Sequence, residues 1–230
     1  MPDSEQVRAD VASLLNVLSD GGVGIVPLDV AYAICASRAD GIERIFVAKQ
    51  RSYEKPSGML GNAALSRAIH CMDDWRHGLV EQLINVDGIP FSVVAPFATD
   101  HPMFASVEPF VMRNSSKQGT LDMLLNAGVL HDEIAVQSAS LNMPVFGSSA
   151  NASLSGSKYN LLDIDEPVRN AADICFDYGQ SKYANKHGRS STIIDFRNFA
   201  VVREGVIFAD VCSAFARHGI VLQSNNGTAR

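Results

Sequence analysis

The sequence of 230 residues lacks an excess of positive charge. It contains 19 Lys and Arg against 25 Asp and Glu, a formal net charge of −6 at pH 7. Proteins that bind nucleic acid chiefly through charge need a basic face that displaces counter-ions from the phosphates. The composition therefore argues against broad, charge-driven nucleic-acid binding. A local basic cleft, built from few residues, remains compatible with it.

Paired cysteines, histidine clusters and long apolar runs are also absent. The four cysteines stand alone among apolar or helix-forming neighbours, and the six histidines form no H-E-x-x-H motif. This predicts buried thiols in a reducing compartment, with no disulfide framework and no metal site. No run approaches the length of a membrane span, and the N-terminal residues 1–5 are polar and acidic. We therefore expect a cytoplasmic protein without a signal peptide.

The common glycine-rich nucleotide motifs are missing as well. Neither G-x-G-x-x-G nor G-x-x-x-x-G-K-[ST] occurs, so neither a Rossmann site nor a P-loop is supported. Predicted strands and helices alternate without strict order, and there is no internal repeat. This pattern predicts one α/β (α+β) domain over residues 1–222, with a polar, disordered tail at 223–230.

Hydrophobic periodicity and turn residues place the individual elements. We take the apolar run at 30–36 as a continuation of the strand at 23–26 after a kink at Pro27, and residues 52–62 and 114–119 as loops. The helices are predicted at 5–19, 41–49, 63–70, 73–85, 130–141, 165–172 and 209–218. The strands are predicted at 23–26, 30–36, 91–95, 108–113, 144–147, 173–177, 192–196 and 200–203.

A first basic cluster follows the helix predicted at 41–49. Lys49, Arg51 and Lys55 place three positive charges within seven residues. Cations at a helix C-terminus are favoured by the helix dipole, so capping is one interpretation. A phosphate clamp is the other, because arginine offers a planar fork and lysine a mobile point charge.

Two further polar segments follow or enter predicted strands. The loop Gly147-Ser148-Ser149-Ala150-Asn151 opens directly after a buried strand, where ligands commonly bind in α/β sheets. Its alternative is an ordinary Ser/Asn turn. A polar loop at 188–192 enters one strand, and Arg203 leaves the partner strand, which is also compatible with a solvated hairpin.

Together these segments resemble the YrdC-like family, whose best-known members are threonylcarbamoyl-adenylate synthases. The resemblance runs from Gly21 to about Ile207. Five stretches carry it, in order: G-G-V-G-I-V-P-L-D-V-A-Y at 21–32, K-Q-R at 49–51 with K-P at 55–56, S-A-N at 149–151, S-S-T-I-I-D at 190–195, and R-E-G at 203–205.

The resemblance implies a twisted mixed sheet with helices on its faces and a central basic cleft. In that family ATP, L-threonine and bicarbonate give threonylcarbamoyl-AMP for modification of tRNA adenosine-37, with ATP as a substrate and Mg²⁺ expected beside it. The implied catalytic residues are Lys49 and Arg51. The residues implied for nucleotide binding are Arg51, Lys55, Thr120, Ser149, Asn151, Ser191 and Arg203, and those for the substrate pocket are Val30, Tyr32 and Ser92.

Departures from the family pattern concentrate on the amino-acid side. The family segment P-T-D-T is Pro27-Leu28-Asp29-Val30 here, without the two hydroxyls. The arginine of the family's G-T-x-x-x-R run is replaced by Leu124. Each lost charge-assisted hydrogen bond costs on the order of 1.5–3 kcal/mol. The phosphate-facing residues are thus retained, whereas the threonine-facing residues are not.

Three interpretations remain open at this stage. The chain is a synthase of threonylcarbamoyl-AMP, that is, a nucleotidyltransferase working with tRNA-modification proteins. Alternatively it adenylylates another carbamate, for example one derived from carbamoyl phosphate. In the third interpretation it is a non-catalytic nucleotide- or RNA-binding module, because a fold alone does not determine a function.

Overall fold

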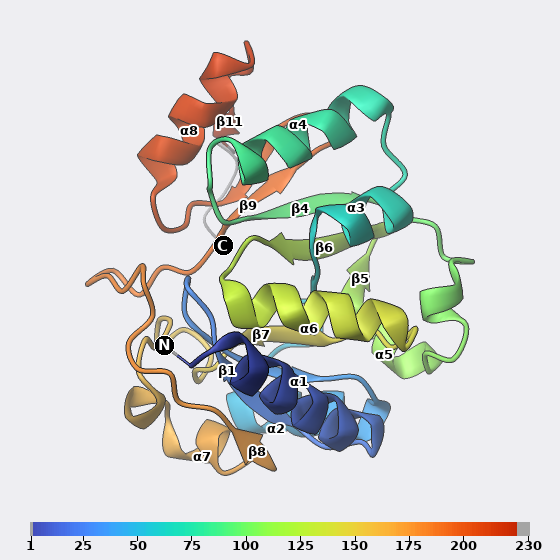
Figure 1. Ribbon diagram of the computed structural model, residues 1–230, viewed down its shortest axis with the longest axis vertical. Helices are drawn as coiled ribbons and strands as arrows, with labels where there is room; N and C mark the ends of the chain where they lie inside the picture. The colour runs from blue at the N-terminus through green and yellow to red at the C-terminus, as the bar shows by residue number, and fades with distance from the viewer. Residues whose placement is uncertain (1, 225–230) are drawn as a thin grey trace.

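A twisted mixed sheet runs through the molecule (Figure 1). The computed structural model describes residues 2–224, and within them eleven strands form one sheet in the order β11-β10-β9-β4-β6-β3-β7-β2-β1-β8, with β5 paired to β6. The strands are β1 Gly24–Pro27, β2 Tyr32–Ala36, β3 Gly58–Leu60, β4 Phe91–Pro96, β5 Ser116–Lys117, β6 Thr120–Leu125, β7 Phe146–Ser149, β8 Ile174–Cys175, β9 Thr192–Asp195, β10 Ala200–Arg203 and β11 Gln223–Ser224.

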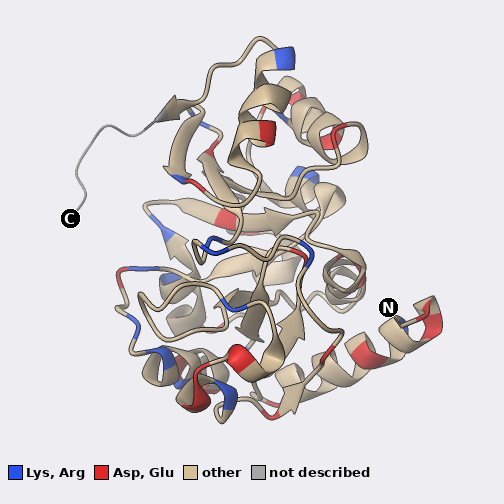
Figure 2. Cartoon of the chain, turned by 90° about the vertical axis from the view of Figure 1, so that its left-hand side faces the viewer, with Lys and Arg blue, Asp and Glu red and all other residues tan. Residues whose placement is uncertain are grey.

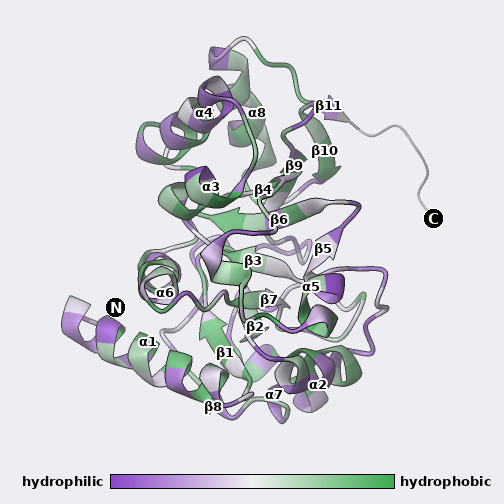
Figure 3. Cartoon of the chain, turned by 90° about the vertical axis from the view of Figure 1, so that its right-hand side faces the viewer, coloured by the Kyte–Doolittle hydropathy of each residue, from purple (hydrophilic) through white to green (hydrophobic). Residues whose placement is uncertain are grey.

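Helices pack on both faces of this sheet. The helices are α1 Ser4–Ser19, α2 Ala39–Lys49, α3 Ala63–Ile69, α4 Asp74–Asn85, α5 Pro109–Ser115, α6 Val129–Ser140, α7 Glu166–Arg169 and α8 Phe208–Arg217, with short 3-10 turns at Pro102–Phe104 and Leu161–Asp163. Figure 3 shows α1, α3, α4 and α6 on one side of the strands and α2, α5 and α7 on the other. The predicted α/β architecture, a mixed sheet with helices on its faces, is confirmed.

Helix α1 illustrates how local sequence sets an element. Asp3 caps its N-terminus by accepting hydrogen bonds from the backbone N–H groups of Glu5 and Gln6, at 3.0 and 2.9 Å. The apolar residues at helical spacing (Val7, Val11, Leu14, Leu15 and Leu18) are all buried. Gly21 follows the helix with φ +84°, a conformation that suits glycine, and turns the chain into β1.

The two segments of the first apolar region form a hairpin. β1 and β2 pair antiparallel, with Gly24 opposite Cys35 and Pro27 opposite Tyr32. The prediction that residues 30–36 continue the first strand after a kink is therefore wrong. The chain reverses at residues 28–31, so that β2 lies between β1 and β7 in the sheet.

Other predictions from the sequence also fail locally. Residues 109–115 form helix α5, not a strand, because Pro109 supplies the preset φ of a first helical turn. Strands β3 and β6 lie where loops or no elements were predicted. Of the cysteines, only Cys35 is buried, whereas Cys71 and Cys175 are exposed.

Two residues of the predicted tail belong to the sheet. Gln223 and Ser224 form β11 and pair in parallel with Ala200 and Val201 of β10. The rest of the predicted tail, 225–230, lies outside the described residues. No helix within the described residues is long and apolar enough to cross a membrane.

Candidate functional site

The floor of the candidate site is one face of the three central strands β9, β4 and β6. Ser92 of β4 is paired with Leu124 on β6 and Ile193 on β9. In the next row of the same face, Val94 lies between Asp122 and Asp195. Directly paired residues project to the same side of a sheet, as do residues two apart along a strand. The opposite face of these strands packs into the core.

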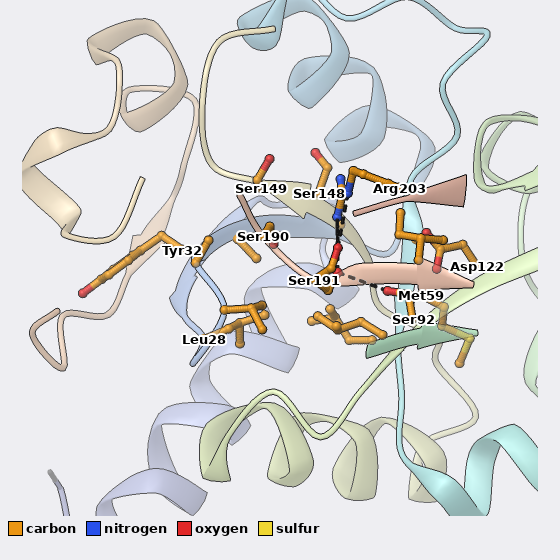
Figure 4. Close-up of a pocket in the computed structure, with 18 of the residues that line it drawn as sticks. Leu28, Tyr32, Met59, Ser92, Asp122, Ser148, Ser149, Ser190, Ser191 and Arg203 are labelled. Atoms are coloured by element: carbon orange, nitrogen blue, oxygen red, sulfur yellow. Dashed lines mark hydrogen bonds between the residues drawn. The ribbon is translucent and has the colours of Figure 1, made fainter. Parts of the chain in front are cut away.

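Two connected hollows lie over this floor. The inner pocket, of about 140 Å³, lies against β2, β3 and the start of β9 and is shown in Figure 4. The outer cleft, of about 750 Å³, lies between residues 49–56, 115–120 and 151–157 and Arg203. The residues that line both are Arg51, Pro56, Asp122, Ser149, Ile193 and Arg203. The volume of the outer cleft lies within the range typical of small-molecule sites. The smaller inner pocket is suited to a small group attached to such a ligand.

Arg51 is held rigidly at the junction of the two hollows. Its backbone N–H closes the end of α2 by donating to the Phe46 carbonyl at 2.9 Å. Its guanidinium donates to the carbonyls of Lys55, at 2.9 Å, and Pro56, at 2.8 Å, and lies 5.7 Å from the centre of the Phe46 ring. The remaining Nη1 donates to no group among the described residues, so it is available to a ligand.

The ammonium of Lys49 is bound by backbone carbonyls. The side chain is 1% exposed, and its ammonium donates to the backbone carbonyls of Ser149 and Asn151. Burial lowers the pKa of this ammonium to about 7, and the nearby Arg51 charge adds to the shift. Lys49 thus joins the end of α2 to the 149–151 loop. Lys55, in contrast, is exposed at the rim of the outer cleft.

The Ser149–Asn151 loop is organised internally as well. The Ser149 hydroxyl donates to the Asn151 side-chain oxygen, and the Asn151 amide nitrogen donates to the Ala152 carbonyl at 2.6 Å. The two side chains therefore hold the loop in shape, and both face the outer cleft. The hydroxyl of Ser148, which is buried, has no partner among the described residues.

Arg203, at the end of β10, meets Ser191, which directly precedes β9, as Figure 4 shows. The Arg203 guanidinium donates to the Ser191 carbonyl at 2.9 Å and to its hydroxyl at 3.2 Å. That hydroxyl also lies 3.2 Å from the hydroxyl of Ser92. A bulge before Arg203 changes the pairing of β10 with β9 and re-aims the side chain.

A close backbone contact requires glycine at the third position of the R-E-G stretch. A Cβ on Gly205 would lie 2.2 Å from backbone atoms of Ser191 and Thr192. Its N–H donates to the Thr192 hydroxyl at 3.1 Å. The close approach of these backbones places Ser191 within reach of Arg203.

The remaining predicted residues line the same two hollows. Val30 and Tyr32 line the inner pocket. The Tyr32 hydroxyl points away from it, towards Asp177 and the Gly179 carbonyl at 2.8 and 2.9 Å. Thr120 lines the outer cleft, and its hydroxyl donates to the Lys117 carbonyl at 2.7 Å. The structure thus brings every predicted site residue to one site, while their binding and catalytic roles stay predictions.

Several cleft residues were not found by motif comparison. Lys117 lines the outer cleft, and so does Arg197, which pairs with Asp195 at 2.7 Å. Asp122 lines both hollows at the centre of β6. A single charged residue inside an otherwise apolar strand, T-L-D-M-L-L, is the signal that could have singled out Asp122.

The charges at the junction perturb one another. Burial lowers the pKa of Arg51 and of Arg203, and the Arg203 charge lowers the pKa of Arg51 further. Burial raises the pKa of the Asp122 carboxyl to about 6, against the opposing effects of Arg203, the Ser92 hydroxyl and Arg51. Perturbed groups that share a cleft are characteristic of functional sites.

Comparison with known proteins identifies the family of this chain. A profile of the Sua5/YciO/YrdC family, described as "Telomere recombination", matches residues 16–205. The chain belongs to the Sua5/YciO/YrdC family. No curated protein sequence matches it.

Solved structures of the family share the fold. A hypothetical protein from Streptococcus mutans superposes with a TM-score of 0.74 at 17% identity, covering 92% of this chain and 93% of that one. Sua5 of P. abyssi, solved with L-threonine, gives 0.72 at 15% identity, covering 98% of this chain and 60% of Sua5. Full-length HypF, in a phosphate- and nucleotide-bound form, gives 0.62 at 13% identity, covering 86% and 29%.

Proposed function

We propose that the outer cleft binds ATP and that the protein transfers its adenylyl group to a small carbamate in the inner pocket. The observation that carries this proposal is the direct connection of the two hollows through Arg51 and Arg203. A nucleotide in the outer cleft with its phosphates at this junction would present the α-phosphate to the inner pocket. The nucleotide-bound HypF and the threonine-bound Sua5 support the proposal as relatives of the same fold.

The chemistry requires positioning and charge neutralisation more than a strong base. A carbamate oxygen attacks the α-phosphorus, the bond to the bridging oxygen breaks, and pyrophosphate leaves with the bonding electrons. In this arrangement Arg51 and Arg203, at the junction, would stabilise the charge that builds up on the α-phosphate. Lys55 and Lys117, at the rim, are placed to neutralise the leaving pyrophosphate.

Mg²⁺ is compatible with this site as a companion of the nucleotide. No cluster of three or more His, Cys, Asp or Glu that could hold a metal occurs among residues 2–224. Mg²⁺ in phosphoryl-transfer sites commonly uses one or two carboxylates together with substrate phosphates. Of the carboxylates that line the outer cleft, Asp195 is already paired with Arg197, whereas Glu54 forms no ion pair among the described residues and could serve here. When bound, the ion would supply charge neutralisation at the phosphates.

The lining of the inner pocket favours a carbamate other than that of threonine. Leu28, Val30 and Leu124 line it at the positions where the family pattern has two hydroxyls and an arginine. Apolar side chains there give a free amino-acid carboxylate no partner. Threonylcarbamoyl-AMP synthesis remains the alternative that the family resemblance implies.

Pyrophosphate release from ATP and bicarbonate, measured with and without L-threonine, tests the proposal. We expect little or no stimulation by threonine, and release when a different carbamate or carbamoyl donor is supplied. Strong threonine-dependent release would instead establish the threonine-specific reaction. ATP binding without turnover under every condition would contradict both enzymatic proposals.

A further inference from the structure

Asp122, at the meeting point of the two hollows, has one carboxyl oxygen, Oδ1, without a hydrogen-bond partner among the described residues. It lines both the inner pocket and the outer cleft from the middle of β6. Its Oδ1 is sealed from solvent and accepts no hydrogen bond from the described residues. Neither Arg51 nor Arg203 forms an ion pair with it in the part of the chain that the structure describes.

A buried carboxylate oxygen without a donor is costly, because water no longer solvates it and no donor replaces the water. Burial raises the pKa of Asp122 to about 6, against the lowering effects of Arg203, the Ser92 hydroxyl and Arg51, so the carboxyl is ionised at pH 7.5 while its Oδ1 has no donor. Rotation about the Cβ–Cγ bond of an aspartate side chain is little restricted, so either carboxyl oxygen can turn towards the hollows. A group entering the pocket can therefore supply the missing donor.

The neighbouring charges decide which kind of donor fits. Arg51 and Arg203 both act electrostatically on Asp122, and both line the inner pocket. Two guanidinium groups favour an anionic ligand and disfavour an ammonium group placed between them. An uncharged N–H avoids that repulsion and still satisfies the carboxylate. Leu124, two residues along the same face, gives such a ligand no competing polar contact.

We propose that Asp122 determines specificity by accepting a hydrogen bond from an uncharged amide-type N–H of a ligand whose anionic group is bound by Arg51 and Arg203. The inference rests on the proposed function in placing the second substrate in the inner pocket. It adds the chemistry by which that substrate is selected: a neutral carbamoyl-type NH₂ beside an anion, and not a free amino acid.

Carbamoyl phosphate and acetyl phosphate form a matched pair of probes, because an NH₂ in the first is a CH₃ in the second. Isothermal titration calorimetry at pH 7.5 should show that the unmodified protein binds carbamoyl phosphate at least tenfold more tightly, the effect of one charge-assisted hydrogen bond. Asp122→Ala should reduce this preference to within about twofold while leaving acetyl phosphate binding as tight or tighter. Asp122→Asn, which is nearly isosteric, should also reduce it and serves if the alanine variant does not fold.

Asp195→Asn is the control variant, since Asp195 lies on the same floor but is paired with Arg197. It should keep the full preference for carbamoyl phosphate. Equal binding of both probes by the unmodified protein, or a preference that survives in Asp122→Ala, would overturn the inference.

ATP titration of the same samples separates this inference from the proposed function. If the unmodified protein binds ATP but shows no preference for carbamoyl phosphate, the role of Asp122 fails and the nucleotide proposal stands. Failure to bind ATP with the preference intact would sink the nucleotide proposal and leave the role of Asp122 standing.

Discussion

At the scale of single residues, the two lysines of the first basic cluster do different work. Lys49 is buried and donates to two loop carbonyls, whereas Lys55 is exposed and its side chain makes no hydrogen bond among the described residues. The motif K-x-R-x-x-x-K therefore combines a structural crosslink with a surface charge. Lys49 helps to build the cleft, and its ammonium is already occupied by protein carbonyls.

Lys49→Met should destabilise the fold by roughly 1–3 kcal/mol, because the Ser149 and Asn151 carbonyls lose their donor. Lys55→Met should leave the melting temperature unchanged and weaken ATP binding. Thermal unfolding and calorimetry of both variants test this contrast. An unchanged melting temperature for Lys49→Met would show that the crosslink contributes nothing to stability.

Asp122 makes stability depend on pH in a defined direction. Its pKa in the folded protein is raised from 3.8 to about 6, so folding favours the protonated form. Its stabilising contribution is complete below pH 3.8 and is lost as the pH rises through about 6. Asp122→Asn should therefore stabilise the protein at pH 7.5, on the order of 1–3 kcal/mol, and much less at pH 4. Urea unfolding at both pH values measures the difference; a gain that does not vary with pH would contradict it.

At the scale of elements, the sequence predicts those with clear periodicity and misses the central strand β6. Helix α1 and the β9–β10 hairpin have clear periodicity and turn residues, and they were placed to within a few residues. β6 was missed, although it is central and pairs with β3, β4 and β5. Asp122 interrupts the apolar pattern of β6, and Gly119 directly precedes the strand, so the local sequence favours a loop. The tertiary pairing overrides that preference.

For the candidate site, the sequence predicts which residues line it but not where their side chains point. The motif residues from five separate stretches line one connected site. This grouping could be predicted from the order of the motifs along the chain and their match to the family pattern. The sequence could not show that Lys49 binds protein carbonyls or that the Tyr32 hydroxyl turns towards Asp177. Those facts depend on side-chain directions, which are set by packing and not by spacing.

Gly205→Ala tests whether the close approach of β9 and the chain after β10 is essential. The added Cβ would collide with backbone atoms of Ser191 and Thr192, which cannot move without breaking the hairpin. We expect a loss of more than about 2 kcal/mol of stability together with weaker ATP binding, because Ser191 and Arg203 would be displaced.

Gly78→Ala is the matched control, since a Cβ there meets nothing within 4 Å and the residue lies inside α4. It should be neutral or stabilising by about 0.5–1 kcal/mol. Chemical unfolding of both variants gives the comparison. Similar stabilities for the two would refute the steric explanation of the R-E-G stretch.

At the scale of the whole molecule, charge is mixed rather than polarised. Figure 2 shows Lys, Arg, Asp and Glu interspersed over the chain, in keeping with the net charge of −6. The outer cleft is lined by more basic residues (Lys49, Arg51, Lys55, Lys117, Arg197 and Arg203) than acidic ones (Glu54, Asp122 and Asp195). On the proposed function, selection of a small anion therefore arises from this local site and not from the net charge of the molecule.

Bulk tRNA should bind weakly for this reason. In a filter-binding assay at about 0.15 M salt we expect no retention of tRNA at a protein concentration of about 10⁻⁵ M. This is about ten-fold below the weak end of non-specific dissociation constants, about 10⁻⁴ M. Repeating the assay at low salt provides the control, because any electrostatic binding strengthens there. Micromolar binding at the higher salt would show a nucleic-acid surface beyond the cleft.

The central claim is that Arg51 and Arg203 form a nucleotide-phosphate site at the junction of the two hollows. Calorimetric titration of ATP into the unmodified protein, Arg51→Ala and Arg8→Ala tests it most directly, since Arg8 is exposed on α1, outside the cleft. We predict that Arg51→Ala weakens ATP binding about 10- to 100-fold and that Arg8→Ala leaves it unchanged. Equal affinity for all three proteins, or no ATP binding at millimolar concentration, would contradict the claim.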